Sequence, residues 1–190
     1  MGPLDFTHTL VPERACGDCF ACCDVSAIDD PALRKPPHVL CEHYRGGCTV
    51  YAARPATCRS FHCLWRRLAG LPDDARPDRI GVLFAFQREG SPDSPFAHVY
   101  VCGYPLVKGD VAVFDTPAVQ TVVRRLTEDG GLPVWISLGE RKRLVWPDRA
   151  LGDAILSPAS VTDPELKARA ETWRKRYDRW VRLYDMAGGT

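Results

Sequence analysis

The chain has 190 residues, of which 45% are hydrophobic and 26% are charged, so it is long enough to bury a core of its own. Its 25 Lys and Arg residues nearly balance 24 Asp and Glu residues, and a net charge of +1 gives no overall field that would recruit nucleic acid or an anionic membrane. No run of about eighteen apolar residues occurs and no secretory signal begins the chain, so we expect a cytoplasmic protein with reduced cysteines and no membrane contact.

The first third of the chain, residues 1–69, is rich in cysteine, glycine and proline and has no sustained hydrophobic periodicity. Such a segment cannot organise itself by apolar burial alone, so we expect cross-links or metal to hold it together. Disulfides are disfavoured because the cysteine count of nine is odd and no export signal is present. The polar, proline-containing stretch 70–79 is typical of a connector to a body that spans 70–190, and we expect one compact domain in total.

The pattern after residue 80 is rich in β-branched and aromatic residues, which indicates strands over 80–86, 98–103 and 111–114. Asp115, Thr116 and Pro117 predict the start of a helix that ends at Gly130 and Gly131. Segments 134–138 and 143–146 flank a short turn and predict a hairpin. Together these segments predict an α+β fold with a small, mainly antiparallel sheet, against which the loop-rich, metal-organised N-terminal region packs.

A long helix is expected at the C-terminal end of the chain. Thr162 and Glu165 have capping-box spacing, and Pro164 fits the first turn. Large apolar residues then form one stripe at spacings of three and four: Leu166, Ala170, Trp173, Tyr177, Trp180 and Tyr184. We expect this stripe to dock on the body, on a protein partner or on a second copy in a homodimer. Basic residues interleave with the aromatic ones, but acidic residues dilute them, which argues against nucleic-acid binding.

Eight of the nine cysteines form one cluster: Cys16, Cys19, Cys22, Cys23, Cys41, Cys48, Cys58 and Cys63. Two residues between cysteines is the spacing at which a turn directs two thiolates to one metal, and its repetition can supply three ligands to one centre. Adjacent Cys22 and Cys23 serve two centres more easily than one, because neighbouring side chains diverge. The eight thiols therefore divide into two sets of four, but the spacing does not assign the members. Cys102 stands apart and is expected to be a buried, inert thiol.

Other residues within the cluster could assist a metal centre. His43 and His62 could replace a cysteine ligand, although eight thiols already suffice for two four-coordinate sites. Four thiolates around a divalent ion leave a charge of about −2 that dipoles or cations must offset. Arg54 and Arg59 are the candidate cofactor-binding cations, and Arg45 lies nearby in the sequence.

The cysteine segment resembles the bacterial CxxCxxCC, or YkgJ-like, family of zinc- or iron-chelating domains. The resemblance covers roughly the first third of the chain and includes a pattern of non-cysteine positions around the later cysteines: Tyr51, Arg54, Pro55, Cys58, Arg59 and Phe61. It implies that the eight clustered cysteines bind metal. Relatives in this family include a flagellin lysine methylase associated with an iron–sulfur cluster. This chain is much shorter, so the resemblance does not imply methylation.

The identity of the metal and the reaction stay open at this point. Three cysteines at two-residue spacing with a remote fourth favour a 4Fe–4S iron–sulfur cluster, or iron, in a redox or cluster-supported reaction. The alternative is structural zinc in a four-cysteine site, with the body acting as a protein-interaction module. The sequence has no phosphate-binding loop, dinucleotide fingerprint, zinc-protease motif or nucleophile elbow, so it identifies no catalytic residue and leaves open whether the protein is an enzyme.

Overall fold

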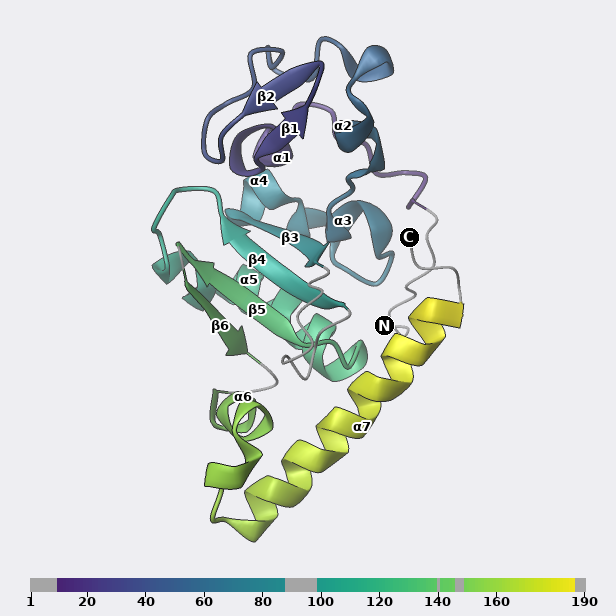
Figure 1. Cartoon of the computed structure of the whole chain (residues 1–190). Helices are drawn as coiled ribbons and strands as arrows, with labels where there is room; N and C mark the ends of the chain where they lie inside the picture. Colours follow the sequence, from purple (N-terminus) through teal and green to yellow (C-terminus); the bar gives the residue numbers. More distant parts are fainter. Residues whose placement is uncertain (1–9, 88–98, 140, 146–148, 187–190) are drawn as a thin grey trace.

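The computed structural model describes residues 10–87, 99–139, 141–145 and 149–186. It confirms an α+β fold with two small sheets and a C-terminal helix (Figure 1). The larger sheet has the strand order β3-β4-β5-β6, formed by Val82–Gln87, Tyr100–Pro105, Val134–Leu138 and Arg141–Val145. The two outer pairings are antiparallel and the central pairing of β4 with β5 is parallel. The sheet is therefore mainly antiparallel, and the predicted hairpin is present as β5 and β6.

The parallel pairing requires a crossover between β4 and β5. The crossover consists of three consecutive helical segments: η3 (Ala112–Asp115), α5 (Pro117–Arg124) and the π-helical turn η4 (Arg125–Asp129). The helix predicted after residue 115 is thus confirmed. The strand predicted over 111–114 is wrong, because the Asp110 carboxylate accepts the backbone N–H groups of Ala112 and Val113 at 3.1 and 3.2 Å and turns the segment into η3.

The main core lies between one face of the sheet and the helices that cover it. Alternate strand residues such as Val82, Phe84 and Val101 contact Val119 and Leu126 of the crossover. In Figure 1, α5 lies behind the sheet. Gly103 pairs with Phe84 across the strands, and a Cβ at this position would lie 2.7 Å from the Phe84 ring. This glycine therefore lets the Phe84 ring pack directly on the sheet.

The stretch 70–79 is not an exposed connector, contrary to the expectation from its polar composition. It folds into η2 (Asp73–Ala75) and α4 (Pro77–Ile80), and Leu71 and Ala75 are only 4% and 5% exposed. Both belong to the same core as Leu64 in α3 (Leu64–Arg67). Gly81 adopts a left-handed conformation with φ of 77° and ends α4, and β3 begins at the next residue, Val82.

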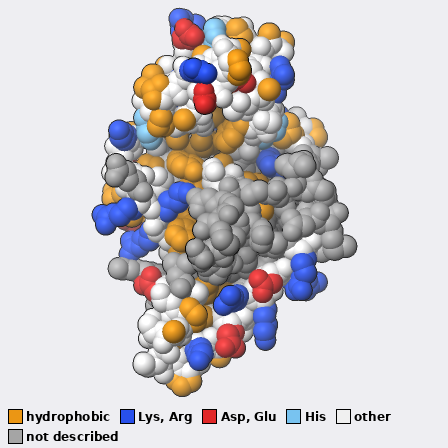
Figure 2. All heavy atoms as spheres, in the orientation of Figure 1, with side chains coloured by type: hydrophobic (Ala, Val, Ile, Leu, Met, Phe, Trp, Pro, Cys, Tyr) orange, Lys and Arg blue, Asp and Glu red, His pale blue; other side chains and the backbone are white. Residues whose placement is uncertain are grey.

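The cysteine-rich region lies on the other face of β3, at the top of Figure 1. Its elements are short: α1 (Ala21–Val25), the antiparallel hairpin β1 and β2 (Ile28–Asp30 and Leu33–Lys35), η1 (Tyr51–Ala53) and α2 (Ala56–Ser60). Ala21 and Val25 pack on Leu83, which points away from the main core. Figure 2 shows hydrophobic side chains along the band between this region and the sheet.

The C-terminal part contains α6 (Arg149–Leu156), which the sequence analysis missed, η5 (Pro158–Ser160) and the expected long helix α7 (Pro164–Met186). The cap of α7 is Asp163 rather than Thr162, because its carboxylate accepts the N–H of Glu165 at 2.9 Å. Leu166, Ala170 and Trp173 of the predicted stripe pack on the main core. The side chains of Tyr177, Trp180 and Tyr184 lie outside the described residues. Within the part of the chain that the structure describes, no helix is both long and apolar enough to cross a membrane.

Candidate metal centre

The eight clustered cysteines come from five short segments that the fold brings together. Cys16 and Cys19 lie in the turn before α1, Cys22 and Cys23 in α1, Cys41 and Cys48 in the loop after β2, Cys58 in α2, and Cys63 directly before α3. Backbone hydrogen bonds of 2.9 Å join Cys19 to Cys16 and Cys41 to Cys23. None of the nine cysteines forms a disulfide, and Cys102 is fully buried in β4, as expected for a core thiol.

The thiols surround two adjoining cavities. The larger, of about 130 Å³, is lined by every clustered cysteine except Cys63. The smaller, of about 30 Å³, is lined by Cys16, Cys19, Cys22 and Cys63. Phe61 and His62 line both cavities and form part of the wall between them. The structure therefore gathers all eight predicted ligands around one compact space.

Two groups of thiols are distinguishable by which cysteines influence one another. A hydrogen bond to Cys23, burial and the charge of Cys23 raise the pKa of Cys22, and the charges of Cys16 and Cys63 raise it further. Burial also raises the pKa of Cys63 to about 11, and the charge of Cys16 contributes to this shift. These interactions group Cys63 with the cysteines of the first turns, far from it in the sequence.

A second group forms around Cys58. Burial raises the pKa of the Cys58 thiol, and the charges of Cys23, Cys41 and Cys48 raise it further. Cys41 and the partly buried Cys23 and Cys58 also pack in one small apolar cluster. The hydrogen bond from Cys22 lowers the pKa of Cys23 to about 7, which makes Cys23 the most acidic of the thiols whose pKa is shifted. Mutual repulsion among thiolates is the condition that a bound cation relieves.

Each cysteine cavity has one arginine with an unpartnered donor. The Nε atoms of Arg54 and Arg66 are buried and have no hydrogen-bond partner. Arg54 lines the larger cavity and Arg66 the smaller one. Buried donors are normally hydrogen-bonded, so an anionic group in each cavity would supply the missing acceptor for each Nε atom. By donor type, the thiols and these two guanidinium groups fit an anionic thiolate–metal centre.

The other residues predicted to assist a metal centre differ in whether they line the cysteine cavities. Arg54 also stacks over the Tyr51 ring at 3.9 Å, whereas Arg59 is exposed and donates to the Arg54 carbonyl at 2.8 Å. The structure does not place Arg59 among the residues that line the cysteine cavities. His43 lines the larger cavity and His62 lines both, so both histidines lie near the thiols. Burial and the charge of Arg54 lower the pKa of His62, which favours its neutral form.

Lys35 is a buried cation beside the second group of thiols, and the sequence analysis did not single it out. Its ammonium group donates to the carbonyls of Asp24, Ser26 and Pro36 at 2.9, 2.5 and 3.0 Å. The positive charge of Lys35 lowers the pKa of Cys23. A lone lysine in a short polar hairpin gives no sequence signal, because its burial depends on the carbonyls of Asp24 and Ser26, at the end of α1, that its ammonium group reaches.

Arg14 holds the first cysteine turn against α3. Its guanidinium group donates to the carbonyls of Trp65, Leu68 and Leu71 at 2.6, 2.9 and 2.7 Å. It also contacts the Asp73 carboxylate at 2.8 Å. Because Arg14 lies just before Cys16 and α3 begins just after Cys63, these bonds bring the two ends of the first thiol group together.

No known protein family, curated protein or solved structure matches this chain. The resemblance to the CxxCxxCC family therefore stays a prediction based on the quoted residues. Among the described residues, no group of three or more His, Cys, Asp or Glu side chains is arranged to hold a metal ion. The structure brings the eight thiols into one region, and binding of a metal ion would require their side chains to reorient.

Proposed function

We propose that the protein is a cytoplasmic metalloprotein in which the eight clustered cysteines hold two neighbouring metal centres. The first set is Cys16, Cys19, Cys22 and Cys63, and the second set is Cys23, Cys41, Cys48 and Cys58. The observation that carries this assignment is the convergence of the eight thiols on two adjoining cavities, only one of which Cys63 lines. In this proposal Cys22 and Cys23 serve different sets, so the hydrogen bond that joins their thiols would break when metal binds.

An iron–sulfur cluster is the proposed group for the first set. Its cysteines repeat at two-residue spacing and take a remote fourth partner, which is the pattern of cluster-binding loops. The unpartnered Nε of Arg66 would donate to the cluster or to a ligating sulfur. When bound, such a cluster supplies one-electron transfer, so the proposed role is electron transfer, redox sensing or support of a redox reaction.

Structural zinc is the second candidate, and the region around the second set favours it. The β1–β2 hairpin and the loop that follows it bury only Ile28, Leu33 and Cys41 in their own cluster. So small a core cannot hold this region by apolar burial alone, whereas a closed four-cysteine zinc site contributes folding free energy directly. In this case the body or α7 would serve as an interaction surface.

The absorption spectrum and metal content of anaerobically purified protein distinguish the two candidates. A broad absorbance near ~400 nm with acid-labile sulfide is expected for a cluster. A colourless protein that contains stoichiometric zinc would contradict the iron–sulfur proposal and support the structural zinc site. A protein that keeps its first 69 residues folded after complete chelation, judged by amide hydrogen exchange, would contradict the expectation that metal organises this region.

Single cysteine variants test the assignment to two sets. Cys63→Ala should remove the metal of the first set and leave that of the second, and Cys58→Ala should do the reverse. Cys102→Ala is the matched control and should leave metal content unchanged, because Cys102 is buried in the sheet away from both cavities. Equal loss of all metal in both cluster variants would contradict two independent centres.

A further inference from the structure

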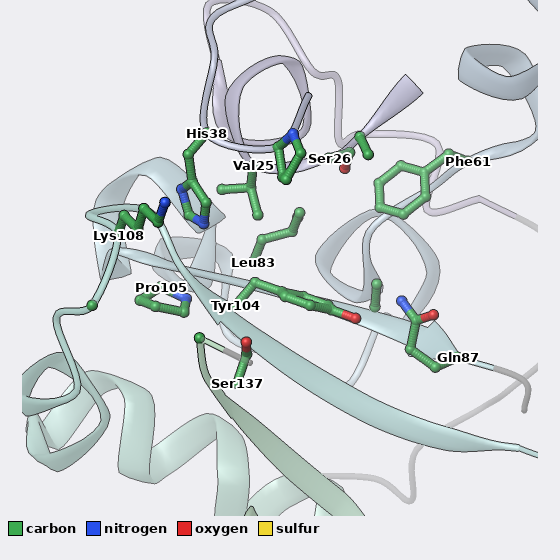
Figure 3. Close-up of a pocket in the computed structure, with 15 residues that line it drawn as sticks. Val25, Ser26, His38, Phe61, Leu83, Gln87, Tyr104, Pro105, Lys108 and Ser137 are labelled. Atoms are coloured by element: carbon green, nitrogen blue, oxygen red, sulfur yellow. The ribbon is translucent and has the colours of Figure 1, made fainter. Parts of the chain in front are cut away.

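A third and much larger cavity, of about 620 Å³, lies between the cysteine-rich region and the sheet. Its floor is the sheet face opposite the main core, where Leu83, Ala85 and Gln87 alternate along β3. Its roof is formed by the cysteine-rich region, including Val25 and Phe61. Figure 3 shows these two sides facing each other across the open space. The volume falls within the range of about 300–1,000 Å³ that is usual for small-molecule sites.

The cavity walls combine an apolar body with polar groups at the edges. Val25, Phe61 and Leu83 supply apolar surface, while Ser26, Gln87 and Ser137 supply hydrogen-bonding groups. Lys108 is the charged residue among the described lining residues, which include no Asp or Glu. Figure 3 shows Lys108 and His38 at one end of the space and Gln87 at the other. This distribution of charge favours an anionic group near Lys108.

His38 supplies a second, independent indication of a ligand. Its Nδ1 atom is buried and has no hydrogen-bond partner. Its backbone also has a positive φ of 55°, which is uncommon for a non-glycine residue and is typical of functional positions. The unpartnered buried side-chain atoms that the structure describes belong to His38, Arg54 and Arg66, and each lies on a different one of the three cavities.

We infer that this cavity binds a small organic anion, a carboxylate or related oxyanion on an apolar or aromatic body. Lys108 and the His38 ring contact the anionic group, and Phe61 and Leu83 contact the apolar body. Phe61 lines all three cavities, so a bound molecule would be separated from the cysteine centre by the width of one aromatic ring. The inference concerns the cavity itself and does not depend on which metal the cysteines hold.

The test uses the metal-containing protein as purified, with anilinonaphthalene sulfonate as a fluorescent aromatic anion. One saturable site is expected, from which indoleacetate displaces the probe at least tenfold more effectively than neutral methylindole. Lys108→Gln should weaken indoleacetate binding by about five- to tenfold, because a charged hydrogen bond is lost at an exposed edge. The control Lys167→Gln, on the exposed surface of α7, should leave binding unchanged.

A second pair of variants tests the location without altering charge. Ser137→Phe places a ring in the cavity from β5 and should abolish saturable binding, whereas Thr172→Phe adds the same ring to the exposed surface of α7 and should not. Binding that survives Ser137→Phe, or equal affinity for indoleacetate and methylindole, would overturn the inference. Metal content is measured on the same samples and should be unchanged in Ser137→Phe, so failure of the metal proposal and failure of the anion site are separately visible.

Discussion

Replacing Arg14 with methionine should show how much of the protein's stability depends on joining the cysteine-rich region to the body. Methionine retains an apolar chain of similar length but removes the donors that reach the carbonyls of Trp65, Leu68 and Leu71. The Arg14 side chain is only 6% exposed, so water cannot readily replace these bonds. The ion pair with Asp73 differs, because the Asp73 side chain is 93% exposed.

The bonds from Arg14 to the carbonyls and its ion pair with Asp73 contribute different amounts to the free energy of unfolding. The Leu68 carbonyl keeps a 3.1 Å bond from the Leu71 N–H, so the loss falls mainly on the carbonyls of Trp65 and Leu71. At roughly 1–3 kcal/mol for each buried group that loses its partner, Arg14→Met should lower the free energy of unfolding by about 3 kcal/mol. Asp73→Asn should lower it by about 0–1 kcal/mol, since exposed ion pairs contribute little.

Urea denaturation followed by tryptophan fluorescence measures both free energies of unfolding, with metal content held equal between samples. The first thiol set should also hold its metal less tightly in Arg14→Met, because Arg14 fixes Cys16 near Cys63. An Arg14→Met protein within 1 kcal/mol of the wild type, or an Asp73→Asn protein as unstable as Arg14→Met, would refute the reasoning. In the second case the ion pair, and not the carbonyl bonds, would hold the two parts together.

Three further predictions concern the cysteine centre. Arg54→Gln should increase the rate of metal loss to a chelator, whereas Arg59→Gln should not, because Arg54 lines a thiol cavity and Arg59 does not. Equal rates for the two variants would show that position at the cavity does not affect metal loss. Lys35→Met should lower the free energy of unfolding by about 2–4 kcal/mol, because three carbonyls lose one buried ammonium donor. An unchanged urea midpoint would argue against a stabilising role for Lys35. Finally, burial raises the pKa values of Cys19 and Cys63 to about 12 and about 11, so both thiols carry protons at neutral pH in the metal-free protein. Metal binding must release those protons, so the affinity for metal should rise by about tenfold per pH unit for each proton released. Competition with a chelator measures this affinity, and a value that does not change with pH would contradict the predicted proton release.

Local features of the fold were predictable because they depend on neighbouring residues. The β-branched and aromatic run 80–86 and the helical spacing after Pro117 identified β3 and α5, and the turn between 138 and 143 identified the β5–β6 hairpin. Two of the wrong predictions concern residues 111–114 and 70–79. The Asp110 carboxylate converted an apolar run into η3, and buried Leu71 turned a polar stretch into part of the core.

The cysteine spacing by itself determined that eight thiols form one cluster and that Cys102 lies apart, because short repeats restrict where neighbouring thiols can point. It could not determine that Cys63 lines one cavity with Cys16, because that relation depends on the packing of segments distant in sequence, such as Arg14 on α3. The tertiary structure also decided that Lys35 is buried beside the second thiol group and that His38 and Lys108 share a cavity with β3. These relations join segments distant in sequence, and burial of apolar surface between them creates both the cavities and the electrostatic environment of the thiols.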